Sequence, residues 1–532
     1  MQQLKQFIEE LLFGKKMVIL AAQFTRKNSM GIIQKQSLQN AVFLYAGVLL
    51  GAINKYVLFS HILGGDKMGL TDILLSTALI LTQFAKLGSG SMLIRFFPYF
   101  QRHTSKQASF YFLNLVFYPL VGFILAYLGV MLFKEPFLAH FSEKSALFVT
   151  YYLYTFPLAL GYTLFTSFFS FSQSNLKTVV PVAIQEVGVR LWQAAAVLLF
   201  HFEYIGFDLF LLLYALTYWA TLAALVTYLV WLGRLKLAIR FDLWGTKLHR
   251  IMWRIGGVLF LARVVETLKD NLTAIQAAAL IGLNGTAIYS LSGFIAMMIY
   301  VPVRAMNSIA LPIVIHDMQA KNFDRLKEIY QKTAINGLVV AMLMFLLIVV
   351  NLKLLITFLP QQKFQGLDAI QPLTIFLGIS RLFDVANGVN AAIVEYAKKT
   401  FQYTFYTNVL MVFVILGLNF LLMKQMGLVG AGMAAMISML LYNSLNTFII
   451  WKTYRIHPFT LKSLYPVLIC GALLGLYYLL PFDYSSLWVA LPFSALISVL
   501  YLTLTYFLNI SENINAMIRG AVKKLKGVVK KG

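Results

Sequence analysis

Residues 254–316 decide the fold of this chain. They read RIGGVLFLARVVETLKDNLTAIQAAALIGLNGTAIYSLSGFIAMMIYVPVRAMNSIALPIVIH, two apolar runs separated by the short polar turn Leu283-Asn284-Gly285. A helix needs about 20 predominantly apolar residues to cross the hydrocarbon of a bilayer, and each run is long enough. Asn and Gly favour a tight reversal of the chain. The stretch therefore predicts a transmembrane helical hairpin.

Charged residues lie inside both runs of this hairpin: Arg263, Glu266, Lys269 and Asp270 in the first and Arg304 in the second. At about 100° per residue, Arg263, Glu266 and Asp270 fall within about 60° of one another on one helix face. A charge in hydrocarbon costs about 3 kcal/mol or more, so such residues usually face a bundle interior or a water-filled path. We expect a polar cavity here. The alternative is a set of structural ion pairs, but Arg304 has no acid within one helical turn.

The composition is that of a polytopic membrane protein. Of the 532 residues, 60% are hydrophobic and only 12% are charged, and the mean hydropathy is +0.77. Soluble proteins carry about 25% charged residues. The single cysteine, Cys470, excludes an internal disulfide framework. The sequence contains no metal-ligand cluster, P-loop or nucleophile elbow, so we expect no cofactor and no catalytic residues.

Windows of about 20 apolar residues predict an all-α fold with about 14 transmembrane helices. We also expect a separate short interfacial helix at residues 321–332. The expected spans outside the hairpin are 38–60, 70–97, 109–133, 145–169, 178–200, 207–232, 333–350, 370–395, 401–423, 427–451, 464–480 and 487–508.

The net charge of +24 reflects Lys and Arg in alternate loops, which the positive-inside rule assigns to the cytoplasm. Both termini are therefore predicted to be cytoplasmic. The longest basic connection of the first half, residues 233–253, divides the chain into lobes. The predicted organisation is an N-terminal cytoplasmic segment 1–37, an N-lobe 38–232, a cytoplasmic linker 233–253, a C-lobe 254–452, an apolar pair of helices 453–510 and a basic cytoplasmic tail 511–532.

A weak internal repeat favours two related lobes. Ile62-Leu63-Gly64 can be aligned with Leu280-Ile281-Gly282, allowing a one-residue shift in the apolar pair. Counting on from the two glycines without a gap then places Lys86 on Arg304. Two rare intramembrane cations thus share one repeat position, as in transporters built from repeated halves.

Three stretches carry a resemblance to a known family. Residues 31–100, which begin GIIQKQSLQN and end SMLIRFFPYF, residues 299–314 (IYVPVRAMNSIALPIV) and residues 367–397 (LDAIQPLTIFLGISRLFDVANGVNAAIVEYA) resemble Wzx-type polysaccharide and O-antigen precursor flippases. These proteins belong to the multidrug/oligosaccharidyl-lipid/polysaccharide (MOP) exporter superfamily. The resemblance extends from about residue 30 to the C-terminus.

The resemblance implies a MATE/MOP-like fold whose two lobes alternate around a central cavity. It also implies a flippase that moves undecaprenyl-diphosphate-linked oligosaccharides from the cytoplasmic to the periplasmic leaflet of the bacterial inner membrane. These oligosaccharides would be precursors of lipopolysaccharide O-antigen or another polysaccharide, and polysaccharide assembly proteins would be the partners. Related lipid II flippases line the cavity with cations, and their two extra C-terminal helices form a groove for the polyprenyl tail. Lys55 lies where those flippases carry an arginine, and Asp72 and Lys86 lie where they carry an acid and an arginine.

A diphosphate requires positive charge, which lysine supplies as a point charge and arginine as a bidentate fork. The competing interpretation of Lys86 and Arg304 is that they extend to the membrane interface. Tyr289, Tyr300, Asn387 and Asn390 are candidate sugar contacts. The candidates for substrate binding are Lys55, Lys86, Arg263, Arg304 and Arg381.

Acids at membrane depth can carry protons or bind sodium, so we expect H⁺ or Na⁺ coupling through Glu266, Asp270, Asp72 and Asp384. Glu266 and Asp270 are four residues apart and repel when both are ionised, which suits a proton carrier. The alternative is neutralisation by Arg263 and Lys269. Glu186 with Arg190, and Arg381 with Asp384, have ion-pair spacing.

Two other functions remain open, and a third is disfavoured. A MATE-type multidrug/cation antiporter needs a net acidic or aromatic cavity, whereas the cations above favour a positive one. A lipid II flippase would share the cationic cavity. A membrane enzyme such as a polymerase or ligase would need a large outer loop with polar catalytic groups, and every predicted outer loop is short.

Overall fold

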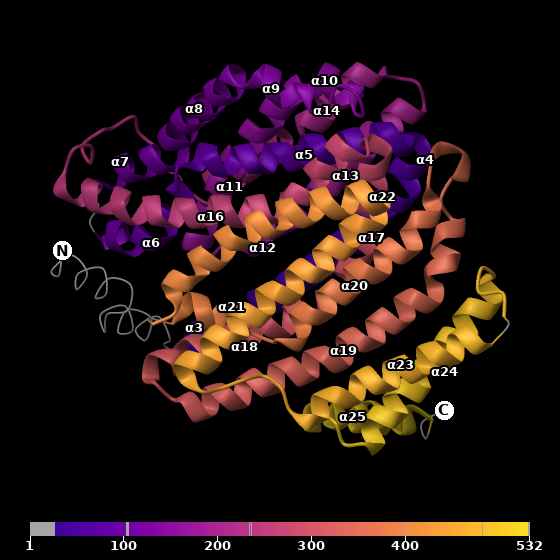
Figure 1. Ribbon diagram of the computed structural model, residues 1–532. Helices are drawn as coiled ribbons and strands as arrows, with labels where there is room; N and C mark the ends of the chain where they lie inside the picture. The colour runs from indigo at the N-terminus through magenta and orange to yellow at the C-terminus, as the bar shows by residue number, and fades with distance from the viewer. Residues whose placement is uncertain are drawn as a thin grey trace. The chain divides into compact units, whose positions relative to one another are not determined.

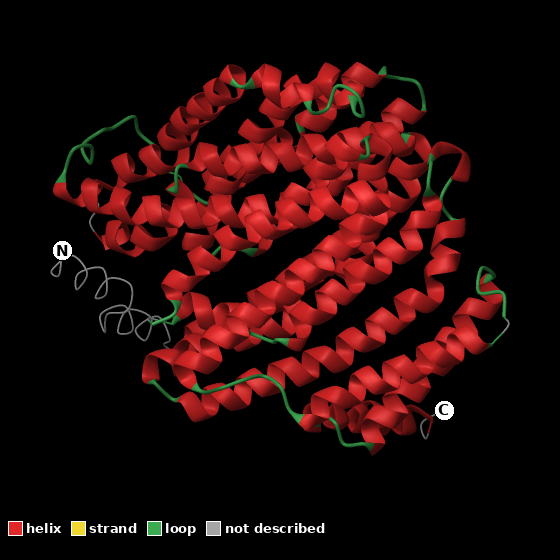
Figure 2. Cartoon of the chain, in the orientation of Figure 1, coloured by secondary structure: helices red, strands yellow, loops and turns green. Residues whose placement is uncertain are grey.

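The computed structural model describes residues 27–102, 106–233, 235, 237–397, 399–480 and 482–529. Within these ranges the regular elements are helices, and no strand occurs (Figure 2). Helices suit a bilayer because hydrocarbon offers backbone amides no water, so their hydrogen bonds must close within each segment. The predicted all-α class is confirmed. Most of the predicted N-terminal segment lies outside the described residues.

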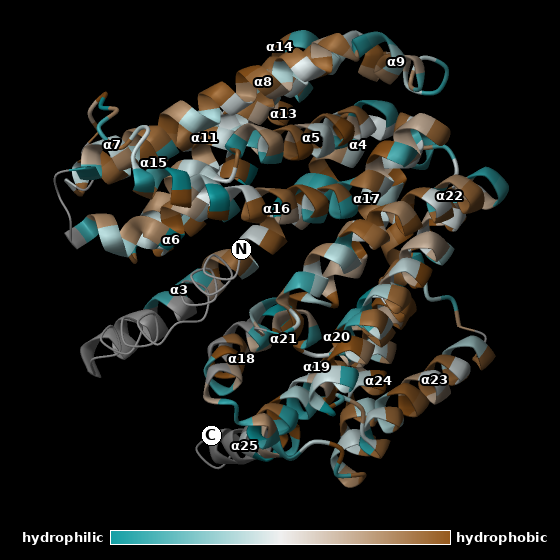
Figure 3. Ribbon diagram, turned by 60° about the vertical axis from the view of Figure 1, so that its left-hand side comes forward, coloured by the Kyte–Doolittle hydropathy of each residue, from teal (hydrophilic) through white to brown (hydrophobic). Residues whose placement is uncertain are grey.

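Ten helical segments of the described chain are long and apolar enough to cross a membrane. Most helices carry apolar surface along much of their length, as the brown colour of α23 (Leu464–Leu479) illustrates in Figure 3. α22 (Phe401–Tyr454) counts once among the ten although it has 54 residues. The multi-pass character is thus established, and the count of 14 spans stays a prediction.

α22 is a hairpin of two helices. Gly427 at its middle has φ 57° and ψ −135°, a conformation open essentially to glycine. The backbone at Gly430 then packs so closely against Leu422 that a Cβ on Gly430 has no room. One residue therefore reverses the chain.

The helices form two compact units, which are described separately. Of the described residues, the N-terminal unit comprises Lys27–Ser290 with Gln362–Gln365, and the C-terminal unit comprises Leu291–Gln361 and Gly366–Val529. The N-terminal unit contains α3 (Lys27–Ala52), η1 (Ile53–Phe59), α4 (Ser60–Ile62), α5 (Gly64–Lys86), α6 (Ser89–Arg102), α7 (Gln107–Phe112), η3 (Leu113–Phe117), α8 (Tyr118–Leu132), α9 (Lys134–Ala139), α10 (Ala146–Tyr151), η4 (Tyr152–Tyr154), α11 (Thr155–Ser174), α12 (Val179–Ala183), η5 (Ile184–Gly188), α13 (Val189–His201), α14 (Phe207–Ala215), α15 (Thr217–Trp231), α16 (Lys247–Leu280) and the first half of α17 (Leu283–Met298).

α5 is the central helix of the N-terminal unit. It packs against α8, α11 and α16 (Figure 1), and Met68, Leu70 and Ile73 are fully buried. Gly122 of α8 lies against the backbone of Ala85, with no room for a Cβ. Small residues allow such close approach, which replaces the hydrophobic effect as the force between helices in lipid.

The C-terminal unit is built around α19 (Phe323–Thr357), which packs against α20 (Ile370–Ala386), α23 and α24 (Leu487–Phe507). α20 in turn packs along α22. The remaining elements of this unit are the second half of α17, α18 (Val301–Ala320), η6 (Gln361–Lys363, of which only Gln361 belongs here), η7 (Leu367–Ala369), α21 (Asn390–Tyr396), η8 (Leu461–Ser463) and α25 (Glu512–Val529).

Two local predictions are wrong. The predicted turn at Leu283-Asn284-Gly285 is the start of the next helix, α17, and the reversal lies at Ile281–Gly282, where Gly282 has φ 117°. Residues 323–332 are the first turns of the continuous helix α19 rather than a separate short helix. Asn322 caps the start of this helix by accepting a hydrogen bond from the Arg325 amide (3.3 Å).

The two glycines that anchor the proposed repeat both have positive φ, 72° at Gly64 and 117° at Gly282. The cations differ in local setting, because Lys86 is the last residue of α5 and Arg304 lies in the first turn of α18. The division into lobes at residues 233–253 stays a prediction.

Candidate functional site

Lys55 lies in a π-helical turn, η1, that interrupts the first long helix. Its Nζ lies 2.9 Å from Oδ1 of Asp72 in α5 and also donates a hydrogen bond to Ser290 Oγ in α17. π-Helical turns often mark functional positions because the extra residue redirects side chains. Lys55 therefore ties three helices of the N-terminal unit together through one ammonium group.

Asp72 has a second feature of interest. Its other carboxylate oxygen, Oδ2, is buried without a hydrogen-bond partner among the described residues. A buried acceptor that is left unsatisfied carries a desolvation cost of about 1–3 kcal/mol. A proton or a small cation at this oxygen would remove that cost, so the geometry keeps Asp72 among the candidates for ion coupling.

Lys86 ends α5 at a break in the chain. Leu87 and Gly88 have φ 47° and 79°, and α6 starts at Ser89. Gly88 lies against the backbone of Gly256 in α16, where a Cβ has no room. The break thus brings the cationic end of α5 next to α16, which carries Arg263.

A cavity of about 210 Å³ opens at this break, and we call it the Lys86 cavity. Lys86 Nζ also lies 5.9 Å from the ring centroid of Tyr162, a cation–π contact. The residues that line the cavity include two cations and no acid: Gln83, Lys86, Gly88, Gly90, Ser91, Ile94, Ser170, Leu259, Phe260 and Arg263. The structure therefore brings together two of the five predicted substrate-binding cations.

Arg263 also forms an ion pair within its own helix, with Nη1 2.6 Å from Oε2 of Glu266. Both side chains are well exposed, Arg263 at 56% and Glu266 at 43%. Asp270, one turn further along α16, is exposed as well. The charged face predicted from the helical period is therefore present, and part of it is internally paired.

The C-terminal unit holds a second group of charges. Arg304 in α18 is exposed, and Arg381 and Asp384 in α20 are partly buried. Tyr300 lies within electrostatic range of all three. These three predicted charged residues of the C-terminal unit therefore lie near one tyrosine.

Two of the expected sugar contacts are packing residues. Asn387 Oδ1 accepts a hydrogen bond from Thr447 Oγ1 (2.7 Å), and Asn390 Nδ2 donates to Asn443 Oδ1 (2.9 Å). Both asparagines are buried, so their side-chain amides hydrogen-bond residues 387–390 to α22. The predicted pair Arg190–Glu186 is present, with Nη2 3.1 Å from Oε2. No cluster of potential metal ligands occurs in the described part of the chain.

The structure also contains two apolar cavities that the sequence did not predict. The N-terminal apolar cavity, of about 750 Å³, lies between α5, α8, α9 and α16. The C-terminal apolar cavity, of about 550 Å³, lies between α19, α20 and α23. The second coincides with the region predicted to hold a polyprenyl tail.

Comparison with known proteins rests on structure alone, because no protein-family model and no curated protein matches this chain. The lipid II flippase MurJ in an inward closed conformation superimposes with a TM-score of 0.70 at 14% identity, over 89% of this chain and 100% of that one. An inward-facing multidrug resistance MATE transporter of the MOP superfamily gives 0.56 at 13% identity, over 82% and 99%. A single-residue mutant of the Vibrio cholerae MATE transporter VcmN gives 0.52 at 14% identity, over 81% and 98%.

At such low identity the similarity defines the architecture. This chain has the helical fold of the MurJ flippase and the MATE transporters.

Proposed function

We propose that this protein is a flippase for lipid-linked oligosaccharides, which moves undecaprenyl-diphosphate-linked glycan precursors from the cytoplasmic to the periplasmic leaflet. The observation that carries the proposal is the Lys86 cavity, whose lining contains Lys86 and Arg263 and no acid. A diphosphate that leaves the headgroup region needs this charge. Its fold is shared with a protein described as a lipid II flippase, so lipid II is the alternative substrate.

The finer features of the proposal follow from the sequence. We place the protein in the bacterial inner membrane with both termini in the cytoplasm, and we assign it to the Wzx type that serves polysaccharide or O-antigen assembly. Its two lobes alternate around a cavity that also uses Lys55, Arg304 and Arg381. Glu266, Asp270, Asp72 and Asp384 couple transport to a proton or sodium gradient.

A MATE-type antiporter is the second candidate, since two MATE transporters share the fold. Such a protein must attract cations. Lys86 and Arg263 line one small cavity and disfavour that substrate, because both would repel a cation.

The test is transport by the purified full chain in proteoliposomes. The donor is a fluorescent undecaprenyl-diphosphate oligosaccharide, with lipid II and a cationic dye as competing substrates. Removing one cationic hydrogen bond to phosphate costs about 1.5–3 kcal/mol, so Lys86→Ala should lower flux per inserted molecule roughly tenfold to a hundredfold. Lys86→Arg should retain most of it.

Lys67→Ala is the matched control, because Lys67 lies over the rings of Phe207 (4.8 Å) and Phe200 (5.1 Å) and lines no described cavity. Equal flux in Lys86→Ala and wild type would contradict the assignment of Lys86. Transport of the dye alone would favour the antiporter. Transport of lipid II alone would identify lipid II as the substrate in place of other lipid-linked oligosaccharides. Topology reporters should read cytoplasm near Lys247 and periplasm near Asp483.

A further inference from the structure

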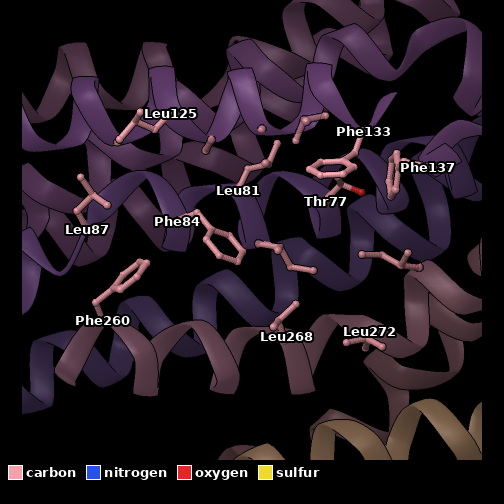
Figure 4. Close-up of a pocket in the computed structure, with 16 residues that line it drawn as sticks. Thr77, Leu81, Phe84, Leu87, Leu125, Phe133, Phe137, Phe260, Leu268 and Leu272 are labelled. Atoms are coloured by element: carbon pink, nitrogen blue, oxygen red, sulfur yellow. The ribbon is translucent and has the colours of Figure 1, made fainter. Parts of the chain in front are cut away.

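The N-terminal apolar cavity has a single polar group in its lining. Thr77 provides that group, as Figure 4 shows by its oxygen atom. Phe84, Leu125 and Phe133 line the cavity and are exposed, so the cavity opens at the surface of the unit. Its lining residues are Thr77, Ile80, Leu81, Phe84, Leu87, Gly122, Leu125, Ala126, Gly129, Val130, Phe133, Phe137, Phe260, Leu268, Leu272 and Ile275.

α16 presents two different faces. The residues that line this cavity, from Phe260 to Ile275, lie about 150° around the helix from the charged face of Arg263, Glu266 and Asp270, at 100° per residue. Ile275 lies fifteen positions after Phe260, so the lining residues of α16 extend the apolar wall over about 22 Å at 1.5 Å per residue. The wall is thus an elongated apolar strip, alongside the charges but facing away from them.

The apolar cavity and the Lys86 cavity adjoin at Phe260, which lines both. Its ring packs edge-on against Phe84, with centroids 6.3 Å apart, and Figure 4 shows these two side chains next to each other. Gln83 and Lys86 lie within one turn of Phe84 on α5 and line the polar cavity. A molecule with an apolar chain and an anionic head would meet matching surroundings on the two sides of Phe260.

We propose that the N-terminal apolar cavity holds the polyprenyl tail of the substrate while its diphosphate occupies the Lys86 cavity. The inference rests on the proposed function and adds a tail site in the N-terminal unit. The family resemblance instead places the tail in a groove of the two C-terminal helices, of which α23 lines the C-terminal apolar cavity. The residues that line the C-terminal cavity include no cation. Charge complementarity therefore favours the N-terminal site.

The physical basis of selectivity is packing together with charge. A tail gains little from leaving lipid, because lipid chains are as apolar as the protein wall. Dispersion contacts with a shaped wall and the phosphate contact next to it must therefore distinguish the substrate from bulk lipid. A polyprenol without phosphate should accordingly bind weakly.

Glycines allow each cavity to be filled without a clash. Gly129 lines the N-terminal apolar cavity and Gly471 the C-terminal one, and a Cβ on either meets nothing within 4 Å. Gly417 in α22 is equally open but lines neither cavity. The variants Gly129→Leu, Gly471→Leu and Gly417→Leu thus make the same change at three places, and each improves helix propensity.

The experiment is photo-crosslinking of the full chain in lipid nanodiscs by a polyprenyl diphosphate that carries a diazirine near the end of its tail. The modified peptides are identified by mass spectrometry. We expect crosslinks in α8 and α16, and a reduction of about tenfold in Gly129→Leu, equivalent to about 1.4 kcal/mol. Gly417→Leu and Gly471→Leu should leave these crosslinks unchanged.

Three results would overturn the tail site. Crosslinks confined to α19, α20 and α23 and reduced only in Gly471→Leu would move the tail to the C-terminal cavity. Equal crosslinking by a diazirine polyprenol would show that the phosphate plays no part. Equal crosslinking by a diazirine phosphatidylglycerol would show that ordinary bilayer lipid occupies the cavity. Transport of lipid-linked oligosaccharide is measured on the same preparations, so its absence beside specific crosslinks would reject the function and leave the tail site standing.

Discussion

Two ion pairs of the N-terminal unit have the same chemistry and different surroundings. Lys55 and Asp72 join η1 to α5, and their side chains are 25% and 13% exposed. Arg263 and Glu266 lie three residues apart on α16 and are 56% and 43% exposed. The first pair links separate helices, and the second is local to one helix.

The difference determines what each pair contributes. A poorly solvated charge depends on its partner, so removal of one member is expensive, whereas an exposed pair contributes about 0–1 kcal/mol. We therefore expect Lys55–Asp72 to fix the arrangement of helices and Arg263–Glu266 to be available for exchange with substrate or an ion. The predictions below test this contrast.

The largest effect is expected from Asp72→Ala. It leaves the Lys55 ammonium without its carboxylate between three helices, which should lower the free energy of unfolding by about 3 kcal/mol. Thermal unfolding in detergent measures the loss. The double variant Lys55→Ala/Asp72→Ala should recover most of it, and a double variant as unstable as Asp72→Ala would show that the pair is not the cause.

The exchanged pair Lys55→Asp/Asp72→Lys separates folding from transport. It retains an ion pair and should keep the melting temperature near that of wild type. Because the positive charge moves from η1 to α5, flux per inserted molecule should fall about tenfold, as for the loss of one phosphate contact. Unchanged flux would reduce Lys55 to a structural role.

Ser290→Ala removes the second partner of Lys55 and leaves the ion pair in place. The free energy of unfolding should fall by about 1 kcal/mol, the usual contribution of one hydrogen bond. Ser290→Thr keeps the hydroxyl and is the control for added bulk. A loss as large as that of Asp72→Ala would mean that the serine, and not the carboxylate, holds the ammonium.

Glu266→Gln should have the smallest effect on stability, below about 1 kcal/mol, because the pair is exposed. Its effect should instead be on coupling. If Glu266 or Asp270 carries the ion, transport by Glu266→Gln or Asp270→Asn should lose its dependence on a proton or sodium gradient while substrate binding remains. Gradient dependence that persists in both variants would argue for neutralised structural charges.

The contrast also marks what sequence can predict. The Arg263–Glu266 and Arg190–Glu186 pairs were foreseen, because helical periodicity places residues three and four apart side by side. Long apolar runs likewise predicted helices with membrane-spanning length and the all-α class. Each of these inferences uses information contained within one helix.

Contacts between different helices could not be predicted from patterns within one helix. Asp72 and Lys55 were each predicted as site residues, but nothing local joins them, and the π-helical turn that carries Lys55 has no sequence signal of its own. The break after Lys86 combines a leucine and a glycine at positive φ, and only the glycine hinted at it. The two apolar cavities depend on how helices pack, which a single sequence does not specify.

The hairpin turn at Gly427 has a consequence for biogenesis. As one straight helix, the 54 residues of α22 would extend about 81 Å at 1.5 Å per residue, far beyond the roughly 30 Å of hydrocarbon. The turn at Gly427 joins the two arms without a connecting loop. Without this glycine conformation at residue 427 the two arms could not fit the bilayer as antiparallel spans, so membrane insertion of α22 depends on this one residue.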